Sequence, residues 1–285
     1  MKLFLLTALT MVSFAANSLL NRAALAEGVI GPANFASIRV ASGVFMLLFL
    51  LALRDHHIPR PASPSWGAIA GLSAYMLGFS YAYVSLDAGL GALILFGGVQ
   101  ITMFAGGVIG GDKPPVVRWA GMFLSMGGLA LLFWPSDYGA IHLGAYLLMT
   151  IAALGWGIYS LMGRTVTDPL HATAWNFTYS LPIVVAALLL NPDTQSTTQY
   201  GVMLAIISGA VTSGLGYALW YSVLPRLGAT VGALSQLSVP VIALVLGAFL
   251  LNEEITSKGI VASALVLGGI GIGILGAGLK KKRQR

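Results

Sequence analysis

Asn17-Ser-Leu-Leu-Asn-Arg22 recurs 142 residues later in the chain as Tyr159-Ser-Leu-Met-Gly-Arg164. The same offset, or one residue less, relates three further pairs: Asn34-Phe35 with Asn176-Phe177, Gly91-Ala-Leu with Gly232-Ala-Leu, and Gly127-Gly128 with Gly268-Gly269. A nearly constant offset of half the chain length indicates an internal repeat rather than chance identities. The 285 residues are therefore predicted to form two related halves.

The composition is that of a protein surrounded by lipid. Hydrophobic residues make up 57% of the chain and charged residues 8%, whereas a soluble domain carries roughly 25% charged residues. A helix needs about 20 apolar residues to cross a hydrocarbon core of about 30 Å. Windows of that length predict ten spans, at residues 3–22, 33–53, 65–86, 88–110, 116–134, 141–163, 171–190, 201–222, 229–251 and 257–279.

The charged residues support these spans and predict an orientation. All nine carboxylates lie in gaps or at span ends: Glu27, Asp55, Asp87, Asp112, Asp137, Asp168, Asp193, Glu253 and Glu254. With the N-terminus inside, twelve of the fifteen basic residues lie on the inner side; the other three are Arg22, Arg39 and Lys258. Because Lys and Arg accumulate on cytoplasmic loops, we predict a multi-pass protein of the cytoplasmic (inner) membrane with both termini cytoplasmic.

Both ends of the chain fit this interpretation. The basic tail, Lys280-Lys-Lys-Arg-Gln-Arg285, is best explained as a topology anchor held by anionic lipid headgroups, so we predict the lipid bilayer and no nucleic acid as a partner. The first twenty residues resemble a signal peptide, with Lys2, an apolar run and Ala15-Ala16. Residues 17–22 belong to the repeat, so we expect the first span to be retained.

Each half contains five predicted spans, and an odd number places the second half in the membrane with the opposite orientation. The predicted fold is an all-α integral membrane protein with ten transmembrane helices in two inverted five-helix repeats, residues 1–137 and 138–285. The fifth and tenth spans are rich in glycine, including Gly121, Gly127, Gly128, Gly268 and Gly269. Small residues let helices approach closely in lipid, which favours packing within each half or a homodimer contact.

Pro240 predicts an interrupted helix in the ninth span, because proline leaves the carbonyl group of Gln236 without its helical partner. The repeat offset places Gly97 and Gly98 at or beside the equivalent point of the fourth span, where glycine loosens a helix. Interrupted helices at matching positions of two repeats indicate a binding site near the bilayer midplane. We predict that Gln100 and Gln236 contact substrate there; alternatively, proline only kinks its helix and the glutamines bond to neighbouring helices.

Arg39 lies clearly inside a span, and charges at such a depth usually face a cavity or a partner. It could bind a substrate carboxylate or phosphate, extend to the outer headgroups, or act as a structural clasp or gate. Other side chains within the spans are predicted to line a cavity for the substrate: Asn17, Tyr75, Trp156, Tyr159, Trp175, Tyr179 and Tyr217. Trp156 and Tyr159 share a helix face through their spacing of three.

The sequence argues against enzymatic chemistry. It contains no cysteine, which excludes disulfides and thiolate sites. The four histidines (His56, His57, His142 and His171) lie in loops or at span ends, so a serine within a span has no histidine to activate it. No metal-ligand spacing occurs, and we predict no catalytic residue, metal or cofactor.

The segment from Gly228 to Thr256 begins with small residues, contains Pro240 at mid-helix and ends with glycine and an acidic pair before a glycine-rich span. In these features it resembles the EamA-type repeat of the drug/metabolite transporter superfamily, and Arg39 matches an arginine that this family carries early in the second span. The resemblance implies a cavity enclosed by spans 1–4 and 6–9, with spans 5 and 10 peripheral, and it favours a clasp or gate role for Arg39.

The first half departs from the family pattern. Gly97-Gly98-Val99-Gln100 stands where the proline would be, and Asp112-Lys113 stands where the second half has Glu253-Glu254. Because we expect Asp112 and Glu253 to be wet, and no carboxylate or histidine lies in mid-span, we predict transport driven by the gradient of the substrate itself.

The predicted function is that of a multi-pass permease for small metabolites, and we favour an amino-acid or related metabolite exporter. The alternative within transport is efflux of drugs or cationic solutes. An alternative of another class is a non-transporting membrane scaffold or a subunit of a lipid enzyme.

Overall fold

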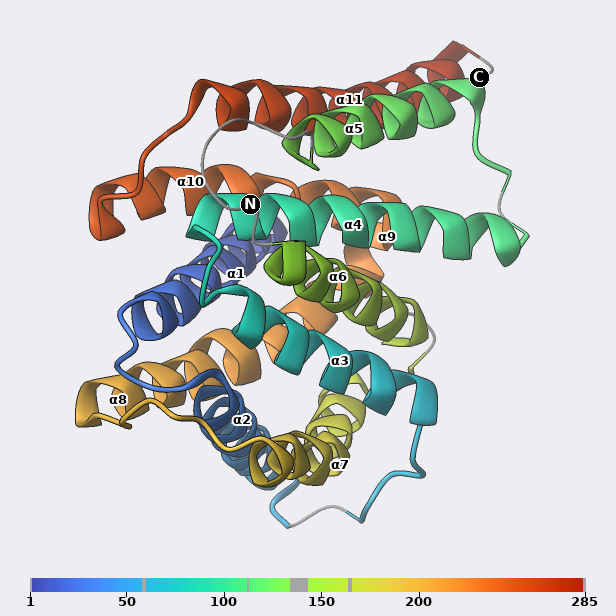
Figure 1. Ribbon diagram of the computed structural model, residues 1–285. Helices are drawn as coiled ribbons and strands as arrows, with labels where there is room; N and C mark the ends of the chain where they lie inside the picture. Colours follow the sequence, from blue (N-terminus) through green and yellow to red (C-terminus); the bar gives the residue numbers. More distant parts are fainter. Residues whose placement is uncertain (1, 58–59, 112, 134–142, 164–165, 284–285) are drawn as a thin grey trace.

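In the computed structural model, the described residues are 2–57, 60–111, 113–133, 143–163 and 166–283, and they form helices joined by turns and loops (Figure 1). The elements are α1 (Lys2–Ala26), α2 (Pro32–Asp55), α3 (Trp66–Ala82), α4 (Ala88–Ile109), α5 (Val116–Phe133), α6 (Leu143–Gly163), α7 (Pro169–Leu190), α8 (Gln199–Ile207), the π-helix η1 (Ser208–Leu215), α9 (Gly216–Ser235), α10 (Ser238–Leu251) and α11 (Ser257–Arg283). Helices are the expected outcome of long apolar segments, because in lipid the backbone must satisfy its hydrogen bonds within each segment.

Among the residues that the structure describes, six segments are long and apolar enough to cross a membrane: Lys2–Ala26, Pro32–Asp55, Ala88–Ile109, Leu143–Gly163, Pro169–Leu190 and Gln199–Leu224. Each coincides with a span predicted from the sequence. Among the remaining helices, α10 is apolar but has only 14 residues. The chain is therefore a multi-pass membrane protein, and the regular structure of its described residues is helical.

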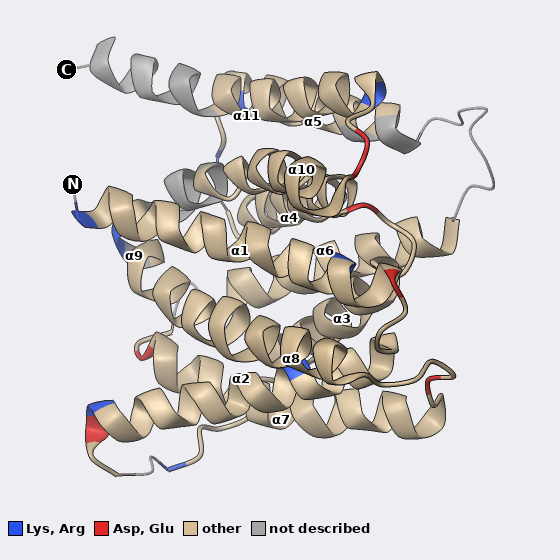
Figure 2. Cartoon of the chain, turned by 90° about the vertical axis from the view of Figure 1, so that its left-hand side faces the viewer, with Lys and Arg blue, Asp and Glu red and all other residues tan. Residues whose placement is uncertain are grey.

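Helices of the two halves pack against one another in pairs. α2 lies beside α7, α3 beside α6, α4 beside α10, and α5 beside α11 (Figure 1). α1 contacts α10, α9 and η1. Acidic and basic residues lie mainly at helix ends and in connecting loops, as Figure 2 shows, so most of the helix surface is free of charge.

α5 and α11 form one edge of the bundle, as predicted for the fifth and tenth spans (Figure 1). A Cβ atom added to Gly121 would collide with the carbonyl oxygen of Gly269. The Ser125 hydroxyl donates a hydrogen bond across the same contact to the carbonyl oxygen of Val266, at 3.1 Å. The glycines thus allow the two backbones to approach closely.

The helix break predicted at Gly97 and Gly98 is wrong. α4 continues without interruption from Ala88 to Ile109. A Cβ atom on Gly98 would lie 2.7 Å from the Cβ of Ala153 on α6. Glycine therefore serves here to bring α4 and α6 together, and this packing offsets its helix-propensity cost of about 1 kcal/mol.

The break predicted near Pro240 is present, but it lies about one turn earlier. The sequence predicted a gap between the spans 201–222 and 229–251, but α9 continues through this gap as far as Ser235. A turn that begins at Gln236 separates α9 from α10. Pro240 falls in the first turn of α10, where a backbone N–H has no helical acceptor in any case. Pro240 has no N–H to offer the carbonyl oxygen of Gln236, as predicted, and this oxygen accepts a bond from the Val239 N–H at 3.2 Å instead.

Candidate functional site

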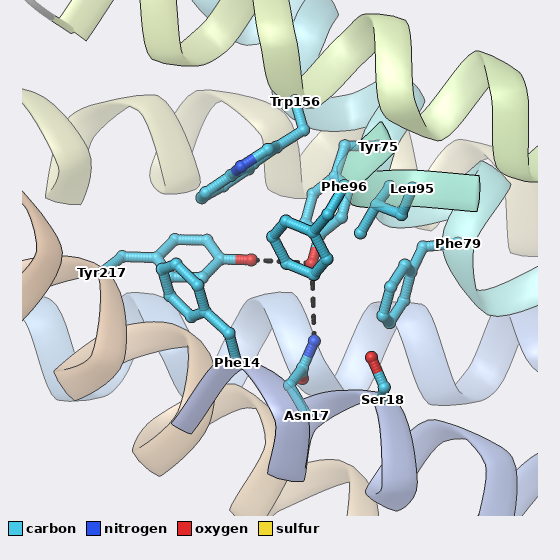
Figure 3. Close-up of a pocket in the computed structure, with 9 residues that line it drawn as sticks. All are labelled: Phe14, Asn17, Ser18, Tyr75, Phe79, Leu95, Phe96, Trp156 and Tyr217. Atoms are coloured by element: carbon cyan, nitrogen blue, oxygen red, sulfur yellow. Dashed lines mark hydrogen bonds between the residues drawn. The ribbon is translucent and has the colours of Figure 1, made fainter. Parts of the chain in front are cut away.

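A small buried cavity lies at the centre of the bundle, between α1, α3, α4, α6 and α9 (Figure 3). It is lined by Phe14, Asn17, Ser18, Tyr75, Phe79, Leu95, Phe96, Trp156 and Tyr217. The centre of a water molecule can occupy only about 10 Å³ of it, which is room for a single water. A metabolite can therefore bind here only after the helices move apart.

The central cavity lies where equivalent positions of the two halves meet. The 142-residue offset relates Tyr75 to Tyr217, and their hydroxyl oxygens are 2.9 Å apart. The same offset relates Phe14 to Trp156, whose ring centroids are 5.9 Å apart. Contact between equivalent residues is expected at the interface of two repeats, which is where repeat-built membrane proteins place their binding sites.

Arg39 lies next to this cavity and reaches it through tyrosine hydroxyl groups. Its Nη2 donates to Tyr75 Oη at 3.0 Å and to Tyr217 Oη at 3.3 Å, and its Nε donates to Ser213 Oγ at 3.0 Å. The guanidinium also lies 5.1 Å from the ring centroid of Phe79, within range of a cation–π interaction. Arg39 is 0% exposed, so the alternative that it extends to the outer headgroups is wrong.

Asn17 connects α1 to the π-helical segment. Its Oδ1 accepts hydrogen bonds from Ser208 Oγ at 2.8 Å and from Thr212 Oγ1 at 3.0 Å, and its Nδ2 lies 3.4 Å from Tyr75 Oη. π-Helical turns are rare and occur frequently at functional sites. The turn brings the Ser208, Thr212 and Ser213 hydroxyl groups to one region, where they bond to Asn17 and Arg39.

Gln236 joins the helix break to the central cavity. Its Oε1 accepts a hydrogen bond from the indole N–H of Trp156 at 3.1 Å, and the side chain is buried. The break near Pro240 and the cavity wall are therefore in direct contact. This is a bond to a neighbouring helix, the alternative considered for Gln236 from the sequence, and its contact with substrate stays a prediction.

A second cavity of about 170 Å³, which we call the inner cavity, lies at the opposite end of the bundle from the start of α4. Tyr159 and Tyr221 line it, with ring centroids 5.8 Å apart. Trp156 lies 5.6 Å from Tyr159 on the same face of α6, as predicted. This pair of side chains links the inner cavity to the central one.

Six of the ten predicted site residues do not line the central cavity. Arg39, Tyr159 and Gln236 contact residues of its wall; the other three are Gln100, Trp175 and Tyr179. Tyr179 donates a hydrogen bond to the carbonyl oxygen of Ala62 at 2.7 Å, and Trp175 packs on Tyr179 with ring centroids 6.0 Å apart. Gln100 lies half-buried on the continuous helix α4. The structure thus places these residues outside the nine that form the cavity wall.

A cluster of charges joins the two halves at the end of the bundle predicted to face outside; we call it the outer clasp. Arg22 lies 3.1 Å from Asp87 and 3.3 Å from Glu253. Both Glu253 oxygens also accept from the Ala88 N–H, at 2.9 and 3.0 Å, so the carboxylate caps the start of α4. The clasp therefore holds α1, α4 and the α10–α11 loop together.

The expectation that Glu253 is wet is wrong, because its side chain is only 10% exposed. Burial raises the pKa of the Glu253 carboxyl above its usual value; the Ala88 N–H and Arg22 counteract this shift, while the charge of Asp87 adds to it. Asp112, for which the same expectation was made, lies outside the described residues.

Sequence reasoning missed the outer clasp and several members of the cavity wall: Phe14, Ser18, Phe79, Leu95 and Phe96. Apolar side chains in a span carry no signal that separates a cavity wall from ordinary packing. Phe14 was recoverable as the residue that the repeat offset relates to Trp156. The only indication of the outer clasp in the sequence was that Arg22 lies on the predicted outer side, which carries few basic residues.

Comparison with known proteins identifies the family of this chain. Residues 143–275 match the model of the EamA-like transporter family. A Pseudomonas aeruginosa protein, "Uncharacterized protein PA1977", is 45% identical over 94% of this chain and 93% of its own length. The Escherichia coli "Probable amino-acid metabolite efflux pump" is 24% identical over 88% of this chain and 90% of its own.

A solved crystal structure shares the fold, with a TM-score of 0.68 at 18% sequence identity, over 93% of this chain and 98% of the other. The relatives match nearly the whole length of the chain, including the half that the family model does not cover. The chain belongs to the EamA-like transporter family.

Proposed function

We propose that this protein exports small metabolites, namely amino acids or related compounds, through the central cavity by alternating access. The observation that carries the proposal is a buried cavity between the two halves, with the outer clasp at one end of the bundle and the inner cavity at the other. Such a site opens to one side of the membrane at a time when the halves rock. The name of the Escherichia coli relative supports the substrate class.

Efflux of cationic solutes is the second candidate, because the cavity wall contains the rings of Phe14, Phe96 and Trp156, and aromatic faces attract cations. The positive charge of Arg39 beside the same cavity opposes this candidate. We therefore retain the amino-acid class as the proposal.

We further propose that ten spanning helices form two inverted five-helix repeats, with a boundary near residues 137 and 138, which lie outside the described part of the chain. The helix contacts support this symmetry. Equivalent helices touch in the pairs α2–α7, α4–α10 and α5–α11. The repeat offset also relates α3 to the segment that begins with η1, and it relates α6 to α1. The contact of α3 with α6 therefore has an equivalent in the contact of η1 with α1.

The proposed orientation places both termini in the cytoplasm. A green fluorescent protein fused after Arg285 is expected to fluoresce, and alkaline phosphatase at the same point is expected to be inactive, because twelve of fifteen basic residues lie on that side. The matched control inserts the same reporters after Ser196, in the exposed loop before α8, where the opposite result is expected. An active phosphatase after Arg285 would contradict the orientation.

Proteoliposomes that contain the purified protein are expected to release preloaded amino acids faster than protein-free vesicles and to stop at equilibrium. A pH gradient is not expected to drive accumulation, since no carboxylate or histidine of the described residues lies in mid-span. The measurement is release of labelled amino acids with and without a pH gradient. Movement of cationic dyes without any amino acid would reject the proposed function.

Glu253→Gln is the variant that tests the driving force in the same assay. It removes the carboxyl group whose burial the sequence did not predict, and it keeps the size of the side chain. Accumulation above equilibrium in the wild type, lost with a protonophore and in Glu253→Gln, would reject a substrate-driven mechanism and identify Glu253 as the proton carrier.

A further inference from the structure

We infer that Arg39, together with Tyr75 and Tyr217, binds the carboxylate group of the transported substrate at the central cavity. The inference rests on the proposed transport function and names the chemical group that the site recognises. Its evidence is the charge of Arg39 and the surplus of hydrogen-bond donors around the cavity.

Arg39 is a buried charge without a neutralising partner in the described part of the chain. Its side chain is 0% exposed, and the ion pairs found there belong to Arg22 and Arg54. Hydroxyl groups and the rings of Tyr75 and Phe79 surround the guanidinium, but they carry no charge. Burying an unpaired ion costs several kcal/mol. An anion that enters the cavity is therefore attracted by a positive charge that no carboxylate of the described residues neutralises.

The two tyrosine hydroxyl groups leave one proton for a ligand. Each hydroxyl oxygen accepts a bond from Arg39 Nη2. In the 2.9 Å bond between Tyr75 and Tyr217 one hydroxyl donates and the other accepts, so the accepting hydroxyl keeps its own O–H free. Both tyrosines line the cavity (Figure 3), and this proton can therefore point to a bound oxygen atom.

Three further buried N–H groups near the cavity have no hydrogen-bond partner: Arg39 Nη1, Gln236 Nε2 and Trp220 Nε1. Gln236 bonds to the cavity residue Trp156, and Trp220 packs on the cavity residue Phe14 with ring centroids 5.8 Å apart. A buried donor without an acceptor costs about 1–3 kcal/mol. The site therefore has a positive charge and unpartnered donors beside it, and no carboxylate in its wall. The Ser18 hydroxyl in the wall is also without a partner and can donate or accept.

A carboxylate fits this chemistry better than a phosphate. It is a planar monoanion whose two oxygens match the fork of a guanidinium, and its charge equals that of Arg39 with opposite sign. A dianionic phosphate would leave an excess of negative charge in the cavity. The aromatic rings of Phe14, Phe96 and Trp156 suit the apolar part of the substrate, and their faces also attract the ammonium group of an amino acid.

The test compares three probes of similar size on the purified protein: 3-phenylpropionate, its neutral amide, and phenyl phosphate. Apparent affinities come from ligand-induced shifts in thermal unfolding. The wild type is expected to bind the carboxylate on the order of tenfold more tightly than the amide, as for one hydrogen bond to a charged group. Equal affinity for acid and amide, or a preference for phenyl phosphate, would overturn the inference.

Arg39→Gln is expected to abolish the preference for the acid while leaving the affinity for the amide within about twofold, since the side-chain amide still donates hydrogen bonds. If Arg39 had only a structural role, the variant would lower the affinity for both probes equally, and that result would overturn the inference. Arg226→Gln is the matched control, because Arg226 is an exposed arginine and its loss should leave the preference intact.

If Arg39→Gln does not fold, the double variant Tyr75→Phe and Tyr217→Phe provides the same comparison. It removes the free hydroxyl proton and is expected to lower the acid preference several-fold; an unchanged preference would contradict the inference. Failure of the inference differs from failure of the proposed function. Proteoliposomes that carry amino acids and their neutral amides equally well would reject the carboxylate site and retain transport.

Discussion

Transport is expected to fall to background when a disulfide forms between the variants Gly89→Cys and Leu244→Cys, and to return when the disulfide is reduced. A Cβ atom at Gly89 would lie 3.0 Å from the Cβ of Leu244 and 2.7 Å from its Cα, so α4 and α10 must move slightly apart to reach the Cβ separation of about 3.5–4.5 Å found in disulfides. Gly89 stands next to Ala88, where Glu253 caps α4, so the bridge fixes α4 to α10 beside the outer clasp. If the outer side must open there for export, a covalent bridge stops the cycle.

The chain has no native cysteine, so within the chain the two introduced cysteines can form a disulfide only with each other. The measurement is amino-acid release from proteoliposomes after oxidation and again after reduction, with each single variant in parallel. A matched control is the pair Gly128→Cys and Leu265→Cys, whose Cβ atoms are also 3.0 Å apart. This pair lies between α5 and α11, which take no part in the cavity wall, and we expect its oxidation to leave transport unchanged.

Full transport by the oxidised 89–244 pair would show that α4 and α10 do not separate, and would reject alternating access at the outer clasp. Loss of transport in the 128–265 control as well would indicate that the peripheral helices also move during the cycle.

Alanine at Gly71 or Gly155 is expected to lower the thermal stability of the protein strongly. A Cβ atom on Gly71 would lie 2.7 Å from the Gly155 carbonyl oxygen, and one on Gly155 would lie 2.5 Å from the Gly71 carbonyl oxygen. Both contacts are with backbone atoms, which cannot rotate away, so α3 and α6 must separate. Overpacking of this kind costs about 1–3 kcal/mol.

Gly127→Ala is the matched control, because nothing lies within 4 Å of a Cβ atom at Gly127 on α5. Alanine there is expected to be neutral or stabilising, since it has about 1 kcal/mol better helix propensity than glycine. Thermal unfolding of the three variants in the same detergent provides the measurement. Gly71→Ala as stable as Gly127→Ala would mean that α3 and α6 are not tightly packed.

Much of the fold could be predicted from the sequence. The thickness of the bilayer fixes the length of an apolar helix, and the cost of burying charge keeps carboxylates out of the spans. The positions of six spanning segments were therefore correct. The edge position of α5 and α11 was implied by the family resemblance, and the structure confirms it (Figure 1). The repeat offset, which is a property of the sequence itself, also identifies Tyr75 and Tyr217 as equivalent positions, and the structure brings them into contact.

The candidate site could be predicted only in part. Asn17, Tyr75, Trp156 and Tyr217 line the central cavity as expected, because polar and aromatic side chains inside a span need a specific environment. Gln100 was selected by the same argument but lies outside the cavity wall. Depth in the membrane can be estimated from the sequence, whereas the direction in which a helix face points cannot.

The tertiary structure alone determined the partners of these residues. Gly98 was predicted to loosen α4, yet it permits close packing against Ala153, because a glycine's effect depends on what stands opposite it. Arg39 donates hydrogen bonds to Ser213 and Tyr217, which lie 174 and 178 residues further along the chain. The sequence determined which segments enter the membrane, since that depends on each segment's own transfer from water to lipid. Helix pairing determined the cavity and the clasp, since these depend on contacts that sequence spacing does not encode.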